Sequence, residues 1–236
     1  MQHLRWHWEQ LTRLVLEGQC PLCDRSTAQT FCPSCQRQLQ QCQLAHHQWS
    51  PTPVPLFAWG SYRGALKRAI GALKYHGNPH LAEPLATWLA DAWLATPNPQ
   101  TQQGLTVIPI PMHPDKQKQR GFNQAERLAT HFCRITRLPC LVNGLSRDRE
   151  TIAQFHLSAA ERQQNLQAAF KPSKTLLNQR FSGSVLLLDD IYTTGATIQA
   201  ATQALHRCGI RVSEAIVLAK AVKEKGGEGW RMKDEG

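Results

Sequence analysis

The 236-residue sequence lacks any apolar run that approaches the ~18–20 residues needed for a membrane-spanning helix. It also lacks the glycine-rich phosphate-loop patterns Gly-x-x-x-x-Gly-Lys-Ser/Thr and Gly-x-Gly-x-x-Gly. Charged residues, namely Arg5, Glu9, Arg13 and Glu17, interrupt the N-terminus, which therefore has no apolar core of a secretory signal peptide. We expect a cytoplasmic protein without membrane insertion that uses neither of these two nucleotide-binding loops.

Acidic residues are scarce relative to basic ones. Asp and Glu total 17 against 27 Lys and Arg, which gives a formal net charge of +10. The segment 113–150 holds eight basic and four acidic residues, so it supplies +4 of that charge. A basic protein attracts polyanions such as pyrophosphate or nucleic acid, although a solvated basic face explains the same composition. The apolar content of 42% supports a folded core.

The stretch 185–198 combines an apolar run, a polar turn and the start of a helix. Residues 185–188 are apolar and run into Asp189 and Asp190. A second apolar run at 212–219 indicates a strand–loop–helix–strand unit, whose loop 189–197 would lie at the carboxyl end of a strand. The helical face between the two runs consists of Ile198, Ala201, Thr202 and Leu205, and Gly209 suits the helix C-terminus.

The chemistry of this loop suits a sugar phosphate. Amide groups at a helix N-terminus have no intrahelical partner and attract an anion. Thr193, Thr194 and Thr197 add hydroxyl donors, and Gly195 permits positive φ and a close approach of the backbone. The two aspartates repel phosphate, but they can accept hydrogen bonds from ribose hydroxyls or help to hold Mg²⁺. The sequence therefore predicts a ribose 5-phosphate site, with an ordinary strand and capped helix as the alternative.

Four cysteines near the N-terminus form two Cys-x-x-Cys pairs, and these are Cys20, Cys23, Cys32 and Cys35. Two such pairs can place four thiolates around a structural Zn²⁺ ion, with Cys42 as a possible substitute ligand. Disulfides are disfavoured in a cytosolic chain, and neither pair lies in the βαβ pattern of a thioredoxin-like redox site. The other cysteines, Cys133, Cys140 and Cys208, have apolar neighbours in the sequence, so we expect them to be buried.

The remaining patterns divide the chain into three parts. Residues 1–50 hold an amphipathic helix and the cysteine module, 51–222 an α/β domain, and 223–236 a tail of disordered composition. Within the domain, helical stripes lie at 66–73, 81–92 and 125–132, and residues 105–111 form an apolar strand with Pro109 near its end. The polar segment 145–170 is typical of a long loop with a short helix that folds over a ligand.

The turn after residue 188 resembles the phosphoribosyl pyrophosphate (PRPP) signature of type I phosphoribosyltransferases. Together with the cysteine pairs and the segments that follow, it resembles the ComF family, which couples a zinc module to a phosphoribosyltransferase-like domain. The resemblance spans roughly residues 18–220. The matching segments are Leu73-Lys74-Tyr75, Ile108-Pro109-Ile110-Pro111, Arg120-Gly121-Phe122-Asn123-Gln124, Arg147-x-Arg149-x-Thr151-x-x-Gln154 and Arg162-x-x-Asn165.

This resemblance implies a parallel sheet flanked by helices, an N-terminal four-cysteine zinc module, and transfer of a phosphoribosyl group from PRPP with Mg²⁺. It implies catalytic roles for Asp189 and Asp190. The residues it assigns to PRPP are Lys74, His113, Arg120, Arg147, Arg149, Arg162, Thr193, Thr194, Gly195, Ala196 and Thr197.

By the same resemblance the protein serves competence and DNA uptake, or nucleotide metabolism. The alternative is a non-enzymatic nucleotide sensor or a competence factor that binds single-stranded DNA, because a phosphate site can outlive its chemistry. The chain departs from the pattern at Ile191-Tyr192, which puts a bulky aromatic side chain beside the phosphate turn. No residue in the sequence identifies a particular acceptor base.

Overall fold

The computed structural model describes residues 18–44, 52, 54–75, 78–96, 104–147, 169–178 and 183–221. The predicted N-terminal helix at 1–17, the segment 148–168 and the tail from 222 onward lie outside these residues. Within the described ranges, no helix combines the length and the apolar character needed to cross a bilayer.

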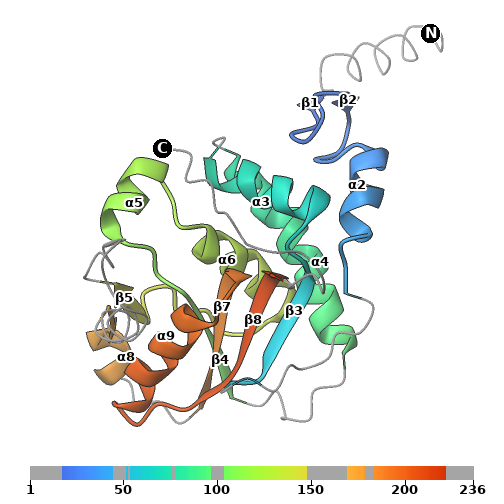
Figure 1. Ribbon diagram of the computed structural model, residues 1–236. Helices are drawn as coiled ribbons and strands as arrows, with labels where there is room; N and C mark the ends of the chain where they lie inside the picture. Colours follow the sequence, from blue (N-terminus) through green and yellow to red (C-terminus); the bar gives the residue numbers. More distant parts are fainter. Residues whose placement is uncertain are drawn as a thin grey trace, which may run out of the picture.

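A four-stranded sheet with the strand order β3-β8-β7-β4 forms the centre of the domain (Figure 1). Every neighbouring pair of strands in it runs parallel, as the sequence predicts for an α/β fold. Parallel strands end at one common edge, so the segments after β4 and β7 come together there. The strands are β3 (Leu56–Ser61), β4 (Leu105–Pro109), β7 (Ser184–Tyr192) and β8 (Val212–Lys220).

Helices cover both faces of the sheet, and the side chains of β7 alternate between two apolar cores. Leu186 and Leu188 pack into the core that includes α3, α4 and α6, whereas Val185 and Leu187 pack into the core that includes α9. A strand buried on both faces needs the continuous apolar run that the sequence has here. The helices are α3 (Gly64–Tyr75), α4 (Ala82–Ala95), α5 (Pro114–Arg120), α6 (Gln124–Thr136), α8 (Lys174–Asn178) and α9 (Ala196–His206), with a 3-10 turn, η1, at Pro79–Leu81.

Two details differ from the sequence-based expectation. First, β7 does not end before the acids, because Asp189 pairs with Val217 and Tyr192 pairs with Lys220 of β8. The predicted loop 189–197 therefore shrinks to the turn 193–195, and both aspartates belong to the strand. Pairing with a long neighbouring strand outweighs the weak strand preference of aspartate.

Second, the ends of the predicted long loop at 145–170 are ordered strands. The strand β5 (Leu145–Arg147) pairs antiparallel with β6 (Phe170–Pro172), in the register Arg147 to Phe170. Leu145 and Phe170 are buried in the core that includes α9. Two short strands, each with few apolar residues, give too weak a periodicity to be recognised in the sequence.

The N-terminal module consists of β1 (Gly18–Gln19), β2 (Ser26–Thr27) and α2 (Pro33–Gln40). It packs on the α/β domain beside α3 (Figure 1), and its cysteines share one apolar core with α3 and α4. A column of three rings joins the two parts, because Trp88 of α4 stacks on Phe31 of the module at 5.9 Å and on Trp59 of β3 at 5.7 Å. Stacked aromatic pairs stabilise such a junction beyond the area that they bury.

Short extended segments also pair with the two outer strands of the sheet. On β3, the Leu44 amide donates to the Trp59 carbonyl at 3.0 Å, and the Ser61 amide donates to the Cys42 carbonyl at 2.8 Å. On β4, the Val107 amide donates to the Pro139 carbonyl, and the Leu141 amide donates back to Val107. The chain that leaves the N-terminal module therefore continues along the outer side of the sheet.

The contact at Gly60 generates a prediction about stability. A Cβ atom on Gly60 would lie 2.8 Å from Leu66 Cδ2 and 2.9 Å from the Cys42 carbonyl oxygen, and the backbone atom cannot move aside freely. Gly60→Ala should therefore lower the free energy of unfolding by about 1–3 kcal/mol, the usual cost of overpacking. Urea denaturation followed by circular dichroism measures this change.

Gly71→Ala is the matched control, because a Cβ atom there meets no other atom within 4 Å and Gly71 lies within α3. Alanine should raise helix stability at that position by about 0.5–1 kcal/mol. Equal effects of the two substitutions would contradict the packing described here.

Candidate functional site

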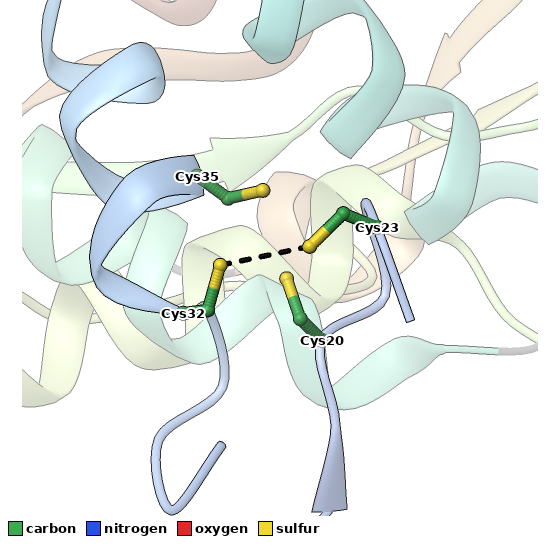
Figure 2. Close-up of side chains that lie close together, drawn as sticks. All are labelled: Cys20, Cys23, Cys32 and Cys35. Carbon is green, nitrogen blue, oxygen red and sulfur yellow. Dashed lines mark hydrogen bonds between the residues drawn. The ribbon is translucent and has the colours of Figure 1, made fainter. Parts of the chain in front are cut away.

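The four predicted zinc ligands gather in the N-terminal module, with their sulfur atoms all within 4.8 Å of one another. Figure 2 shows the four side chains pointing toward a common centre, with Cys23 Sγ 3.6 Å from Cys32 Sγ. A tetrahedral site with Zn–S bonds of about 2.3 Å needs sulfur separations of roughly 3.8 Å. The geometry of the donor set therefore suits one tetrahedral metal ion.

The charge state of the cluster also suits a metal. The Arg25 side chain donates to Cys23 Sγ at 3.3 Å and lowers the pKa of that thiol to about 6, so Cys23 is a thiolate at neutral pH. Burial raises the pKa of Cys35 to about 12, and a bound cation would be needed to deprotonate it. Cys42 lies outside the cluster, because its thiol contacts the carbonyl oxygens of Gln38 and Arg63 at 3.4 Å.

The remaining cysteines differ partly from expectation. Cys133 is buried and Cys140 is half-buried, but Cys208 is exposed, so the prediction that it is buried was wrong. Cys208 follows the last turn of α9, where the chain turns toward β8 at the protein surface. The apolar residues on either side, Leu205 and Ile210, belong to the core, which explains why the sequence pattern predicted burial.

The two acids of β7 lie at the carboxyl edge of the sheet and are both buried. Successive side chains of a strand leave the backbone toward opposite faces of the sheet, although the carboxyl groups of Asp189 and Asp190 still interact with each other. Asp190 continues the row of Leu186 and Leu188 toward α3 and α6. Asp189 continues the row of Val185 and Leu187 toward the other core.

Asp190 forms an ion pair with Lys74 at the end of α3, with 2.5 Å between Oδ2 and Nζ. The Gln124 side chain of α6 donates to Asp190 Oδ1 at 3.5 Å. Burial alone would raise the pKa of Asp190, but the Lys74 ammonium outweighs it and lowers the pKa below its ordinary value. Asp190 is therefore ionised and fixed by two different helices.

Asp189 lies in the opposite electrostatic situation. Its Oδ1 accepts the Asp190 backbone amide at 2.8 Å. Burial raises its pKa well above the ordinary value, and the neighbouring charge of Asp190 adds to the shift. Adjacent carboxylates whose environments separate their pKa values are typical of functional sites.

The turn 193–195 joins β7 to α9 and has the conformation that the sequence predicts. Gly195 takes a left-handed conformation with φ of 82°, and Ala196 begins the helix. Thr193 and Thr194 are exposed, whereas Gly195, Ala196 and Thr197 are partly exposed. A side chain at Gly195 would overlap the Tyr192 hydroxyl, so the aromatic ring lies directly against this turn.

The segment after β4 brings α5 and the start of α6 to the same edge. The Asn123 side chain donates to the Ile110 carbonyl at 3.1 Å and accepts from the Ala125 amide at 3.0 Å. Arg120 Nη1 donates to Gln124 Oε1 at 2.6 Å, so Arg120 connects to Asp190 through Gln124. His113 caps α5 instead, because its Nδ1 accepts from the Asp115 amide at 3.3 Å.

Three of the arginines that the family resemblance assigns to PRPP belong to the segment 145–170, which is only partly described. Arg147 lies in β5, with its guanidinium 5.4 Å from the centre of the Phe170 ring. Burial lowers the pKa of Arg147, and the charge of Asp189 opposes that shift, so Arg147 belongs to the surroundings of Asp189. Arg149 and Arg162 lie outside the described residues and stay predictions.

The sequence-based residue set omitted Gln124 and Tyr75. Gln124 closes the motif Arg-Gly-Phe-Asn-Gln, which is the signal that could have identified it, and the structure shows that its side chain is buried at the start of α6. Tyr75 follows Lys74 directly and is 75% exposed, which sequence alone does not reveal. It lies 5.1 Å from the Arg120 guanidinium, measured to the ring centre.

The divergent environments of the two acids generate a pH prediction. The folded-state pKa of Asp189 is raised above 3.8, so its contribution to stability falls as pH rises from that value. The folded-state pKa of Asp190 is lowered, so its contribution is present above 3.8 and is lost as pH falls below it. Asp189→Asn should therefore raise the free energy of unfolding at pH 7, because it removes a carboxyl group whose ionised form is disfavoured by burial.

Asp190→Asn is the matched comparison and should have the opposite sign. It leaves the ammonium of Lys74 without its counter-ion, which costs about 3–5 kcal/mol in fully buried pairs and less here because Lys74 keeps some exposure. Denaturant titrations between pH 4 and pH 8 distinguish the two. Destabilisation by both substitutions at pH 7 would overturn the assignment of Asp190 as the ionised carboxyl group and of Asp189 as the one whose ionisation is disfavoured.

No protein-family model matches the chain, but curated relatives match most of it, including the following three. "Competence protein F" of Haemophilus influenzae is 28% identical over 218 residues, covering 88% of this chain and 93% of the relative. "DNA utilization protein YhgH" of Escherichia coli strain K12 is 26% identical over 214 residues, covering 87% and 91%. "Competence protein ComFC" of Streptococcus pneumoniae is 27% identical over 197 residues, covering 83% and 77%.

Among solved structures, the adenine phosphoribosyltransferase of Trypanosoma brucei aligns with 84% of this chain and 86% of its own, at 11% identity and a TM-score of 0.37. A similarity of this size carries no argument about the site. The matches to these relatives extend over more than four-fifths of this chain. Similarity along most of the chain to Competence protein F, ComFC and YhgH supports its membership of the ComF family.

Proposed function

We propose that this protein binds PRPP with Mg²⁺ at the carboxyl edge of its sheet and transfers the phosphoribosyl group to an acceptor. We place this activity in the DNA-related role that the names of its relatives carry. One observation supports the proposal above the others. Two buried carboxylates lie near the end of β7, and the three-residue turn 193–195, with left-handed Gly195, leads from that strand to the N-terminus of α9.

This arrangement fits the two ends of a ribose 5-phosphate. The first amides of α9 and the hydroxyl groups of Thr193, Thr194 and Thr197 are donors for a phosphate. Asp190, kept ionised by Lys74, accepts a hydrogen bond from a ribose hydroxyl. Asp189 either accepts from a hydroxyl or, when protonated, donates to it, because a hydroxyl group serves in both directions.

The chemistry of transfer requires stabilisation of a separating charge rather than a nucleophilic side chain. Positive charge develops on the ribose ring as the bond between C1 and pyrophosphate lengthens, and the buried carboxylates lie where that ring would bind. Mg²⁺ would supply charge neutralisation for the pyrophosphate. Arg120 adds a cation on the side of α5, held in place through Gln124.

We further propose that the four-cysteine cluster holds a structural Zn²⁺ ion. Its donors are four sulfur atoms, so a closed tetrahedral site has no position left for a substrate. The module shares its core with α3, the helix that carries Lys74. A zinc ion would therefore stabilise the helix whose lysine fixes Asp190.

A melting experiment tests the ligand proposal. Saturating PRPP with Mg²⁺ should stabilise the wild-type protein by about 2.7 kcal/mol at 100 times Kd. For a protein of this size that corresponds to an increase in Tm of about 5–10 °C. Thr194→Val should weaken binding about tenfold or more, because it removes a donor to a charged group.

Thr130→Val is the control, since Thr130 is also an exposed threonine but lies on α6 with its hydroxyl on the Glu126 carbonyl. It should leave the ligand-induced shift unchanged. Chelation of Mg²⁺ should reduce the shift in every variant. The same shift in the wild type, Thr194→Val and Thr130→Val would place the ligand elsewhere.

Elemental analysis tests the metal proposal. Protein purified under reducing conditions should contain one zinc per chain, and Cys32→Ser should lose the metal and destabilise the N-terminal module. Cys208→Ser should keep the metal, because Cys208 is exposed and outside the cluster. Wild-type protein without stoichiometric metal would refute the site.

A further inference from the structure

A cavity of about 530 Å³ lies beside the acid pair, between the end of α3 and α5. Its lining residues are Lys74, Tyr75, Lys116, Gln119 and Arg120. Small-molecule sites have volumes of roughly 300–1,000 Å³, so the cavity has room for a compact ligand. Lys74 is common to the cavity and to the ion pair with Asp190, so a ligand here would adjoin a bound ribose.

One wall of the cavity is an aromatic ring held by a cation. Tyr75 is 75% exposed, although tyrosine rings are on average only partly exposed. The Arg120 guanidinium lies 5.1 Å from the ring centre, and its hydrogen bond to Gln124 fixes its position. The ring is thus an ordered and accessible surface on which a second planar ring can stack.

The other lining groups are cationic or neutral. Lys74, Lys116 and Arg120 bring three positive charges, Gln119 brings an amide, and no carboxylate belongs to the described lining. Lys74 already neutralises Asp190, but Lys116 is exposed on α5 and its ammonium is available to a ligand. Stacking and positive charge together select a flat ring with a negative group attached to it.

We propose that this cavity is the acceptor subsite and that it takes a planar aromatic ring bearing a negative charge. The proposal rests on the phosphoribosyl transfer proposed above. A nitrogen lone pair of the ring forms the new bond to C1 of ribose while the bond from C1 to the pyrophosphate oxygen breaks. The electron pair of that bond leaves with pyrophosphate, and any proton on the attacking nitrogen passes to water.

A small acceptor fits these observations better than a nucleic-acid strand. The cavity is bounded by two helices and adjoins the acid pair, whereas a strand needs a groove that continues past one aromatic ring. Lys118, on the same helix, does not line the cavity, although it is as basic as Lys116. The positive charge at the cavity therefore comes from the few basic residues that line it and not from every basic residue of α5.

Isothermal titration calorimetry on the full chain with Mg²⁺ tests the proposal with matched ligand pairs. The pairs are 6-carboxyuracil against uracil and nicotinate against nicotinamide, which differ in one negative group. In at least one pair the acid should bind about tenfold more tightly than its neutral partner. Tyr75→Leu should weaken the acid about tenfold, the scale of one lost aromatic stack, whereas Tyr75→Phe should retain its affinity.

Substitutions on α5 test the charge separately. Lys116→Gln should weaken binding of the acid and leave the neutral ring unaffected, whereas Lys118→Gln should change neither. Tyr75 and both lysines are exposed, so the variants should fold, and their Tm values check this. Equal binding of the acid and the neutral ring, no effect of Tyr75→Leu, or no binding of either acid would overturn the proposal.

Two further titrations separate this proposal from its competitors. In the first, pyrophosphate is the ligand. If it binds the wild type, binds Lys116→Gln more weakly and binds Tyr75→Leu as tightly as the wild type, the cavity is a plain anion site and the proposal is overturned. Decathymidylate that binds more tightly than either acid and is weakened in both variants would overturn it in favour of single-stranded DNA. The PRPP-induced rise in Tm of Tyr75→Leu shows whether the ribose phosphate site survives independently of the acceptor subsite.

Discussion

The ion pair between Lys74 and Asp190 is the interaction on which the site depends. A buried carboxylate without a counter-charge would take up a proton. A protonated Asp190 would no longer attract the Lys74 ammonium as a carboxylate does. Lys74 meets Asp190 because α3 runs along the carboxyl edge of the sheet and ends beside β7. The position of that helix also fixes Tyr75, the next residue, and with it the cavity wall.

The alternation of side chains along β7 explains why two adjacent acids behave differently. One carboxylate reaches the face with a lysine, and the other remains on the face where burial raises its pKa. Asp190 is thus ionised, whereas burial disfavours the ionised form of Asp189. The division therefore depends on the alternation of the strand together with a lysine that lies over only one of its two faces.

Much of this architecture could be predicted from residue patterns. The apolar runs at 185–188 and 212–219 identified two central strands, and the two Cys-x-x-Cys pairs identified a cluster that the structure brings together. The strand β3 was missed, because its Gly60 and Ser61 weaken the pattern of a buried strand. The partner of Lys74 could not be predicted, since Asp190 lies 116 positions further along the sequence and only the packing of α3 brings the two together. The fold and the family do not by themselves identify a ligand, because that depends on the individual side chains at the site.

The segments 42–44 and 139–141, which pair with β3 and β4, affect the tendency of the protein to aggregate. An open sheet offers unpaired backbone groups on its outermost strands, and these invite strands of other molecules. Here residues 42–44 cover part of one edge and residues 139–141 part of the other. The first cover is the direct continuation of α2, whose Cys35 belongs to the sulfur cluster. Loss of order in the cysteine module would expose the backbone of β3 as a template for intermolecular pairing, so the module also guards the protein against aggregation.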